Sequence, residues 1–136
     1  MASKPARIVV DTNIFISFLI SDTYSKLDKQ LQAGKIRFLF SEELLHEFLE
    51  VVSRPKIKKY FTDNDLAKLL ESISDHAEFI EVTSDVDVCR DKKDNFLLAL
   101  CDDGKAEYLL TGDEDLLVLK KFKKTTIPKI SEYLAK

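Results

Sequence analysis

The sequence contains little glycine, proline or cysteine, with three, three and two residues respectively in a chain of 136. This composition leaves little room for turn-rich or low-complexity segments, and the chain has neither an internal repeat nor a serine–glycine linker. We therefore expect one folded domain over residues 1–136, which is long enough to bury a hydrophobic core.

Long hydrophobic runs are also absent. The longest nearly apolar run, residues 14–20, contains Ser17 and is far shorter than the roughly 20 residues that cross a bilayer. The first residues lack the apolar region of a signal peptide, so we expect a cytoplasmic protein with no membrane segment. Cys89 and Cys101 have no CxxC partner, which argues against a zinc site.

The excess of positive charge that is typical of nucleic-acid-binding proteins is missing. The formal net charge is −3 and the isoelectric point is about 5.4. If the protein handles nucleic acid, bound cations or local basic patches must offset its acidity. Residues 54–59 and 120–124 are rich in lysine and could contact phosphates. Each segment alone is more typical of a solvated surface.

Short apolar runs alternate with segments of helical spacing along the chain. Strands are predicted at residues 7–11, 36–40, 79–82, 106–110 and 124–127. Helices are predicted from residue 12 onward, at residues 24–33, 41–53, 62–76 and 96–101, and at the C-terminus.

This alternation predicts a three-layer α/β/α fold in which helices cover both faces of a mainly parallel sheet of about five strands. The most apolar strand segments, residues 8–10 and 108–110, should be neighbours on either side of a topological switch point. Residues 79–82 and 124–127 should form edge strands, because the first alternates in polarity and the second carries Lys124 and precedes Pro128.

Acidic residues follow the two strands that we expect at the centre. Asp11 ends the first strand, and Asp113 and Asp115 follow the strand that ends at Leu110. Ligands of open α/β sheets bind beyond the carboxyl ends of the strands at the switch point, so these carboxylates should converge. Carboxylates this close repel one another unless a cation or a proton intervenes. The sequence therefore predicts a site for Mg²⁺ or Mn²⁺ with oxygen ligands.

Two further acids could join this site. Asp94 precedes the apolar helix at residues 96–101, so its backbone is fixed near a helix N-terminus. The helix that begins near Ser41 carries four glutamates. At about 100° per residue, Glu43 and Glu50 point away from its apolar face, whereas Glu47 flanks that face. The spacing therefore favours Glu47 modestly.

Each of these acids has an ordinary structural alternative. Asp11 and Asp94 could simply cap the helices that follow them. Glu47 could lie on a solvated helix face, and Asp113 and Asp115 could belong to a polar turn. Together, however, four carboxylates around one or two metal ions suit phosphodiester hydrolysis. No glycine-rich phosphate loop is present and nothing resembles a Ser-His-Asp arrangement, which argues against other common chemistries.

Four segments in this order resemble the PIN-domain nucleases, and most nearly the VapC-like toxins of bacterial and archaeal type II toxin–antitoxin pairs. They are residues 9–13 (VVDTN), 41–47 (SEELLHE), 94–97 (DNFL) and 110–116 (LTGDEDL). The resemblance covers nearly the whole chain. Each segment is weak evidence alone, but their order and spacing together are specific.

The resemblance implies an endoribonuclease that depends on Mg²⁺ or Mn²⁺, with one or two ions bound. The catalytic, metal-binding acids would be Asp11, Glu47, Asp94 and Asp113, and Asp115 would assist as a ligand or through a bound water. Residues that orient carboxylates or waters from around the site would be Asn13, Ser41 and Thr111. The implied partners are RNA, a small antitoxin protein and a second copy of the chain in a homodimer.

The segment before the third acid departs from the family pattern. Many relatives carry a more acidic, proline-containing stretch where this chain has Arg90-Asp91-Lys92-Lys93-Asp94. Lys92 and Lys93 could contact the RNA backbone, or they could weaken metal binding by repulsion. Either Asp91 or Asp94 could be the ligand, and the Asn-Phe-Leu sequence that follows favours Asp94.

Two other functions remain as alternatives. The chain could be a catalytically silent PIN-fold module that acts by binding RNA or protein, as the two lysines near the site and the low isoelectric point would allow. A phosphoryl-transfer protein on a similar sheet is less favoured. An aspartate-based phosphatase usually has a second aspartate two residues after its nucleophile, and here Asn13 stands at that position.

Overall fold

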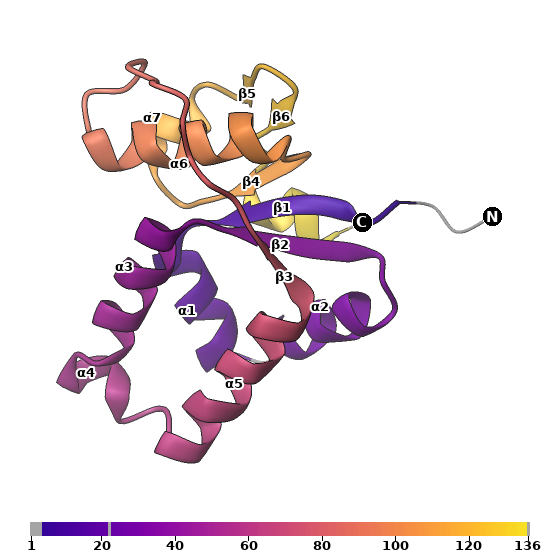
Figure 1. The fold of residues 1–136 in the computed structure, drawn as a ribbon, viewed down its shortest axis with the longest axis vertical. Coiled ribbons are helices and arrows are strands. Elements are labelled where there is room, and N and C mark those ends of the chain that lie inside the picture. The colour runs from indigo at the N-terminus through magenta and orange to yellow at the C-terminus, as the bar shows by residue number, and fades with distance from the viewer. Residues whose placement is uncertain (1–3, 22, 136) are drawn as a thin grey trace.

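A computed structural model describes residues 4–21 and 23–135, which fold around a six-stranded sheet (Figure 1). Its order is β3-β2-β1-β4-β6-β5, and every neighbouring pair is parallel except β5 and β6. The strands are β1 (Ala6–Val10), β2 (Ile36–Phe40), β3 (Ala77–Phe79), β4 (Tyr108–Leu110), β5 (Lys121–Phe122) and β6 (Thr125–Thr126).

Helices occupy most of the remaining chain. They are α1 (Thr12–Ile20), α2 (Thr23–Gln32), α3 (Glu42–Val52), α4 (Pro55–Lys58), α5 (Asp63–His76), α6 (Lys92–Gly104), α7 (Glu114–Leu117) and α8 (Ile130–Leu134). Ser41 caps α3, and Thr62 forms the predicted capping box with Asp65 at the start of α5. None of the helices in the described part of the chain has the length and apolar character needed to cross a membrane.

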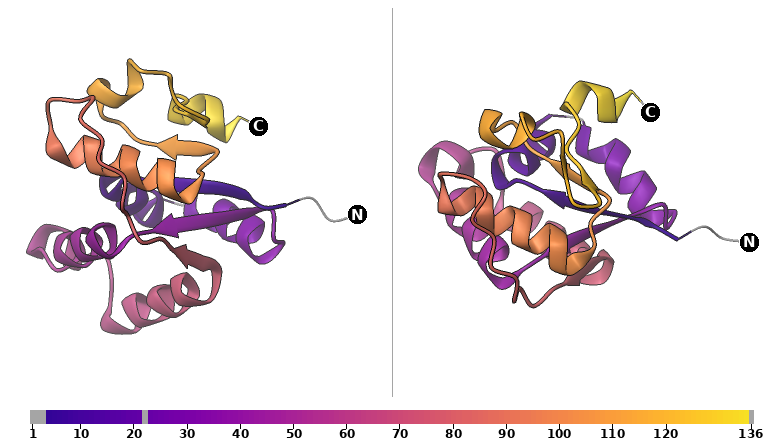
Figure 2. Two further views of the ribbon diagram at one scale, coloured as in Figure 1. Left: turned by 45° about the horizontal axis from the view of Figure 1, so that its top comes forward. Right: turned by 90° about the horizontal axis from the view of Figure 1, so that it is seen from above.

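The side chains of β2 show how helices cover both faces of the sheet. Phe38 and Phe40 pack edge-on against Phe15 of α1, with ring centroids 5.5 and 6.1 Å apart. Leu39 points to the other face, where a Cβ placed on Gly104 of α6 would lie only 2.8 Å from its Cδ1 atom. Figure 2 shows α6 on one side of the sheet and α1 and α2 on the other. The predicted α/β/α layering is confirmed.

The two central strands lie side by side, as predicted. In the parallel pair of β1 and β4, Val9 is opposite Leu109 and Val10 is opposite Leu110, and all four side chains are buried. The chain leaves β1 towards β2 and β3 and returns on the opposite side as β4. The carboxyl ends of β1 and β4 therefore border the switch point, where Asp11 and Thr111 follow them.

The prediction that the last strand forms an edge of the sheet was wrong. Residues 124–127 were expected to form an edge, but β6 lies between β4 and the additional strand β5. The sheet therefore has six strands rather than about five. The hairpin escaped notice because its turn has no glycine. In the turn at residues 123–124, Lys123 instead adopts a positive φ angle of 52°, which non-glycine residues rarely take.

Several element boundaries also differ from the prediction. The edge strand predicted at residues 79–82 is β3, which ends at Phe79, and α6 begins at Lys92 rather than at residue 96 because Asp91 caps it. The short helices α4 and α7 were not predicted. Each has only four residues, which is too short for a periodic pattern.

Candidate functional site

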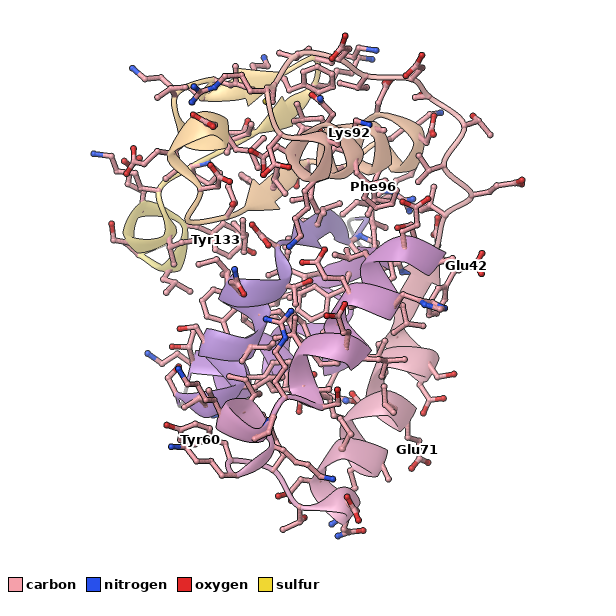
Figure 3. The ribbon with its side chains drawn as sticks, turned by 90° about the vertical axis from the view of Figure 1, so that its left-hand side faces the viewer. Glu42, Tyr60, Glu71, Lys92, Phe96 and Tyr133 are labelled. Atoms are coloured by element: carbon pink, nitrogen blue, oxygen red, sulfur yellow. The ribbon has the colours of Figure 1, made fainter. Side chains whose placement is uncertain are left out.

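Three of the predicted acids meet beyond the carboxyl edge of the sheet. Asp94, Asp113 and Asp115 each offer one carboxylate oxygen, and these oxygens lie within 4.8 Å of one another. Asp94 lies in the first turn of α6, while Asp113 caps α7 by accepting the Asp115 N–H at 2.9 Å. Figure 3 faces this edge, with Lys92 marking the start of α6. Helix α6 and the turn after β4 thus deliver three negative charges to one place.

Asp94 is the most deeply buried of these acids, with 3% of its surface exposed. Its Oδ2 atom is buried and finds no hydrogen-bond partner among the described residues. Burial raises the pKa of Asp94 to about 7, and the adjacent Asp113 carboxylate adds to the shift. A buried carboxylate oxygen without a donor requires a proton or a cation, so this atom suits a hard metal ion.

Thr111 connects Asp11 to this group. Its buried hydroxyl donates to Asp11 Oδ2 at 2.9 Å and accepts the Asp113 N–H at 3.1 Å. Burial raises the pKa of Asp11, and the nearby charge of Glu47 raises this pKa further. The hydrogen bond from Thr111 acts in the opposite direction and lowers it. The hydroxyl therefore fixes the Asp11 carboxylate relative to the turn that carries Asp113.

Glu47 forms an ion pair with a lysine and does not belong to the group of three acids. Lys93 Nζ of α6 lies 3.2 Å from Glu47 Oε1 of α3. This ion pair spans the carboxyl edge, since α3 packs on the α1 face through the Phe15–Phe48 contact and α6 lies on the other face. Glu47 and Asp11 are not part of the group of three carboxylates that could share an ion.

A groove of about 640 Å³ runs beside the site along the polar face of α3. Four of its residues are glutamates, so its surface is mainly acidic. It is lined by Glu42, Glu43, His46, Glu47, Glu50, Arg54 and Lys93. Arg54 is paired with Glu50 at 3.1 Å. Since Arg54 and Lys93 each pair with one glutamate, Glu42 and Glu43 carry the remaining negative charge of the groove.

The positions of Asp91 and Asp94 favour Asp94 as the metal ligand. Asp91 is exposed, and its Oδ1 accepts the Lys93 N–H at 2.9 Å as the cap of α6. Asp94 is buried and belongs to the carboxylate group. The geometry therefore supports Asp94 as the ligand. In the same segment, the Arg90 side chain is 89% exposed and its Nη2 atom lies 3.4 Å from Asp115 Oδ1.

The remaining predicted residues lie at less direct positions. Asn13 is exposed and lines a separate groove with Ile16 and Ser17. The buried Ser41 hydroxyl accepts the Leu44 N–H at 3.1 Å, which caps α3. The described hydrogen bonds thus link Thr111 to Asp11 and Asp113, whereas the hydrogen bond of Ser41 is to its own helix.

Sequence reasoning missed the role of Asn95. Its side-chain oxygen accepts the N–H groups of Val88 and Cys89 at 3.0 and 2.7 Å, and its amide donates to the Cys89 carbonyl at 2.8 Å. Asn95 thereby fastens the loop before α6 beside Asp94. In the sequence, Asn95 stands directly before the apolar run at residues 96–101, a position that gives no indication of its partners.

Comparison with known proteins agrees with this geometry. Residues 7–115, which include all five predicted acids, match the model of the PIN domain family. The uncharacterized protein MJ1680 of Methanocaldococcus jannaschii is 32% identical over 117 residues, which cover 84% of this chain and 75% of that protein.

A solved structure shares the fold. It is a chain of VapBC2 from Rickettsia felis, crystallised bound to a DNA fragment from their promoter. The two chains superpose with a TM-score of 0.56 at 15% identity, over 90% of this chain and 98% of the other. From the match of the family model over most of its length, the chain belongs to the PIN-domain family.

Proposed function

We propose that this protein is an endoribonuclease that depends on Mg²⁺ or Mn²⁺ and hydrolyses RNA phosphodiester bonds. The observation that carries the proposal is the buried Asp94 Oδ2 atom, which lies within a group of three carboxylates and has no hydrogen-bond partner in the part of the chain that the structure describes. Such an arrangement destabilises the metal-free protein, and a site for a cation accounts for it. Membership of a family whose domains are generally nucleases supports the same function.

The chemistry of the donors fits a hard divalent ion. Asp94, Asp113 and Asp115 would hold it, and Asp11 and Glu47 would complete the site. When bound, one or two such ions lower the pKa of a water molecule and neutralise charge that develops on the phosphate. Thr111 would keep the Asp11 carboxylate oriented, because its hydroxyl is itself fixed by the backbone of the next turn.

The biological role that we propose is that of a cytoplasmic toxin in a toxin–antitoxin pair. The shared fold with a chain of VapBC2 supports this role. A small antitoxin with a basic segment would be attracted to the groove of glutamates beside the site. We further propose that residues 1–136 act as one PIN domain and that the protein forms a homodimer.

The decisive experiment compares the wild type with Asp11→Asn on single-stranded RNA in the presence of Mn²⁺. We expect the variant to lose at least about 100-fold in cleavage rate, since it loses a ligand rather than a residue that only supports one. Asp75→Asn, at an exposed position of α5, is the matched control and should cleave normally. Circular dichroism should show the same fold in all three proteins.

Two results would count decisively against the proposal. One is full activity of Asp11→Asn, and the other is undiminished cleavage in excess EDTA. The Lys93–Glu47 ion pair favours a second candidate, a catalytically silent PIN-fold module that binds RNA or protein, because it supplies an internal cation to one of the acids. Calorimetry separates the two, since the module would give no heat with millimolar Mg²⁺ or Mn²⁺.

A further inference from the structure

Lys93 occupies an unusual place for a surface lysine. Its backbone lies in the first turn of α6, directly before Asp94, and its ammonium group reaches over the carboxyl edge of the sheet to Glu47 Oε1 at 3.2 Å. Both members of this ion pair act electrostatically on Asp11: the charge of Glu47 raises the pKa of Asp11 and the charge of Lys93 lowers it. The ammonium group therefore lies at the border of the candidate metal site.

The ion pair divides the acids into two groups. Asp94, Asp113 and Asp115 already lie within reach of one ion, whereas Glu47 is engaged by Lys93 and lies outside that group. A lysine ammonium group and a divalent cation compete for the same carboxylate oxygens, since both bind through positive charge.

We infer that Lys93 acts as an internal cation that withholds Glu47 and thereby weakens the binding of divalent ions at this site. The inference rests on the proposed metal-dependent function and adds a regulatory element to it. Lys93 is a positioning residue in this scheme, because it acts on the ion through Glu47. The pair is within reach of solvent, with side-chain exposures of 57% for Lys93 and 24% for Glu47, so it can open without unfolding α6.

The inference predicts a gain in metal affinity when the ammonium group is removed. Lys93→Met keeps most of the aliphatic chain but not the charge. We expect the Kd for Mn²⁺, measured by titration calorimetry, to fall about fivefold, which corresponds to about 1 kcal/mol for a partly exposed pair. Lys92→Met is the matched control, because Lys92 is exposed and has no ion pair with the described residues.

A double-mutant cycle tests whether the effect passes through Glu47. In a Glu47→Gln background, Lys93→Met should give no further gain, because the withheld carboxylate is already gone. A general field effect of the positive charge predicts instead that the gain persists. A crystal structure with Mn²⁺ provides a second measurement, in which Lys93 Nζ should lie more than 4 Å from Glu47.

The outcomes distinguish this inference from the proposed function. If the wild type binds Mn²⁺ but Lys93→Met does not bind it more tightly, the inference is overturned and the metal site stands. A gain that persists in Glu47→Gln, or an equal gain in Lys92→Met, overturns it in the same way. If neither the wild type nor any variant binds Mn²⁺, the proposed function fails and the inference fails with it.

Discussion

Carboxylates on the two sides of the central sheet have opposite surroundings. At the amino ends of β1 and β2, Arg7 and Arg37 reach the Glu78 carboxylate of β3 at 2.6 and 3.4 Å, and the hydrogen bond from Arg7 lowers the pKa of Glu78. At the carboxyl end, Asp94 has a buried oxygen with no hydrogen-bond partner within residues 4–21 and 23–135, and burial raises the pKa of Asp94. The arginines balance the charge of Glu78, which lies away from the candidate site. No side chain balances the charge of Asp94 in the described residues, at the place where a ligand is expected.

Helix α6 joins these two ends. Its first turn presents Asp94, and near its last turn the Gly104 carbonyl accepts a hydrogen bond from Arg7 Nε at 2.8 Å. The balanced end therefore anchors the helix that carries the unbalanced acid. The comparison implies that substitutions at the carboxyl end alter activity and can raise stability, whereas substitutions at the amino end alter stability alone.

The largest effect should come from Asp94→Asn on RNA cleavage. The variant removes the most buried acid of the group, and we expect a loss of at least about 100-fold in kcat/KM. Initial rates at saturating Mn²⁺ provide the measurement. Activity within a few-fold of the wild type would show that the unbalanced charge at this end serves another purpose.

The same substitution should stabilise the metal-free protein, with a dependence on pH. The pKa of Asp94 is raised from 3.8 to about 7, so its contribution to stability is fully present below about pH 4 and is lost as the pH rises through about 7. In EDTA, we expect the free energy of unfolding of Asp94→Asn to exceed that of the wild type by about 2 kcal/mol at pH 8.

Urea titrations at pH 4 and pH 8 test this expectation. The difference between the two proteins should be much smaller at pH 4, where the wild-type carboxyl is protonated. An equal difference at both pH values would mean that the charge of Asp94 carries no cost in the folded protein.

Thr111→Val should have an intermediate effect at the carboxyl end. The substitution keeps the shape of the side chain but removes the hydroxyl that holds Asp11 and Asp113. We expect cleavage to fall about tenfold, the lower end of the range for residues that orient metal ligands. Thr125→Val is the matched control, because it also loses a buried hydroxyl, bonded to the Ala106 carbonyl at 2.7 Å. The control should lose stability but retain its cleavage rate.

Glu78→Gln should have the smallest effect, and only on stability. It removes the charge that pairs with Arg7 and Arg37, and since these groups are partly exposed we expect a loss of about 1 kcal/mol in the free energy of unfolding. Glu71→Gln, at an exposed site on α5, is the control. A marked loss of cleavage in Glu78→Gln would break the separation between the two ends.

The sequence predicted the parts of the fold that repeat a simple pattern. The strand at residues 36–40 and the capping box of Thr62 follow directly from hydrophobic spacing and turn chemistry, and both are present. The β5–β6 hairpin was missed because lysines occupy the turn positions that glycine or asparagine normally mark. Local patterns identify elements, but they do not reveal a turn that contains neither glycine nor asparagine.

The acids of the candidate site were predictable for a different reason. Asp11 and Asp113 follow the two most apolar strands, so topology alone brings them to one edge. The ion pair between Lys93 and Glu47 was not predictable, because the two residues belong to helices on opposite faces and are 46 positions apart in sequence. An ion pair of this kind depends on how two side chains extend across the edge of the sheet, and the hydrophobic periodicity of the sequence does not encode that geometry.

The crossover between β3 and α6 is tied to that helix at two places. Asp103 accepts the N–H groups of Thr83 and Ser84 at 2.6 and 2.9 Å, and Asn95 holds residues 88–89. Only residues 85–87 lie between these two ties. An inserted peptide at that point could lengthen the loop while leaving Asp94 in place, so the three-residue span is where related proteins can acquire new surface without moving the three grouped carboxylates.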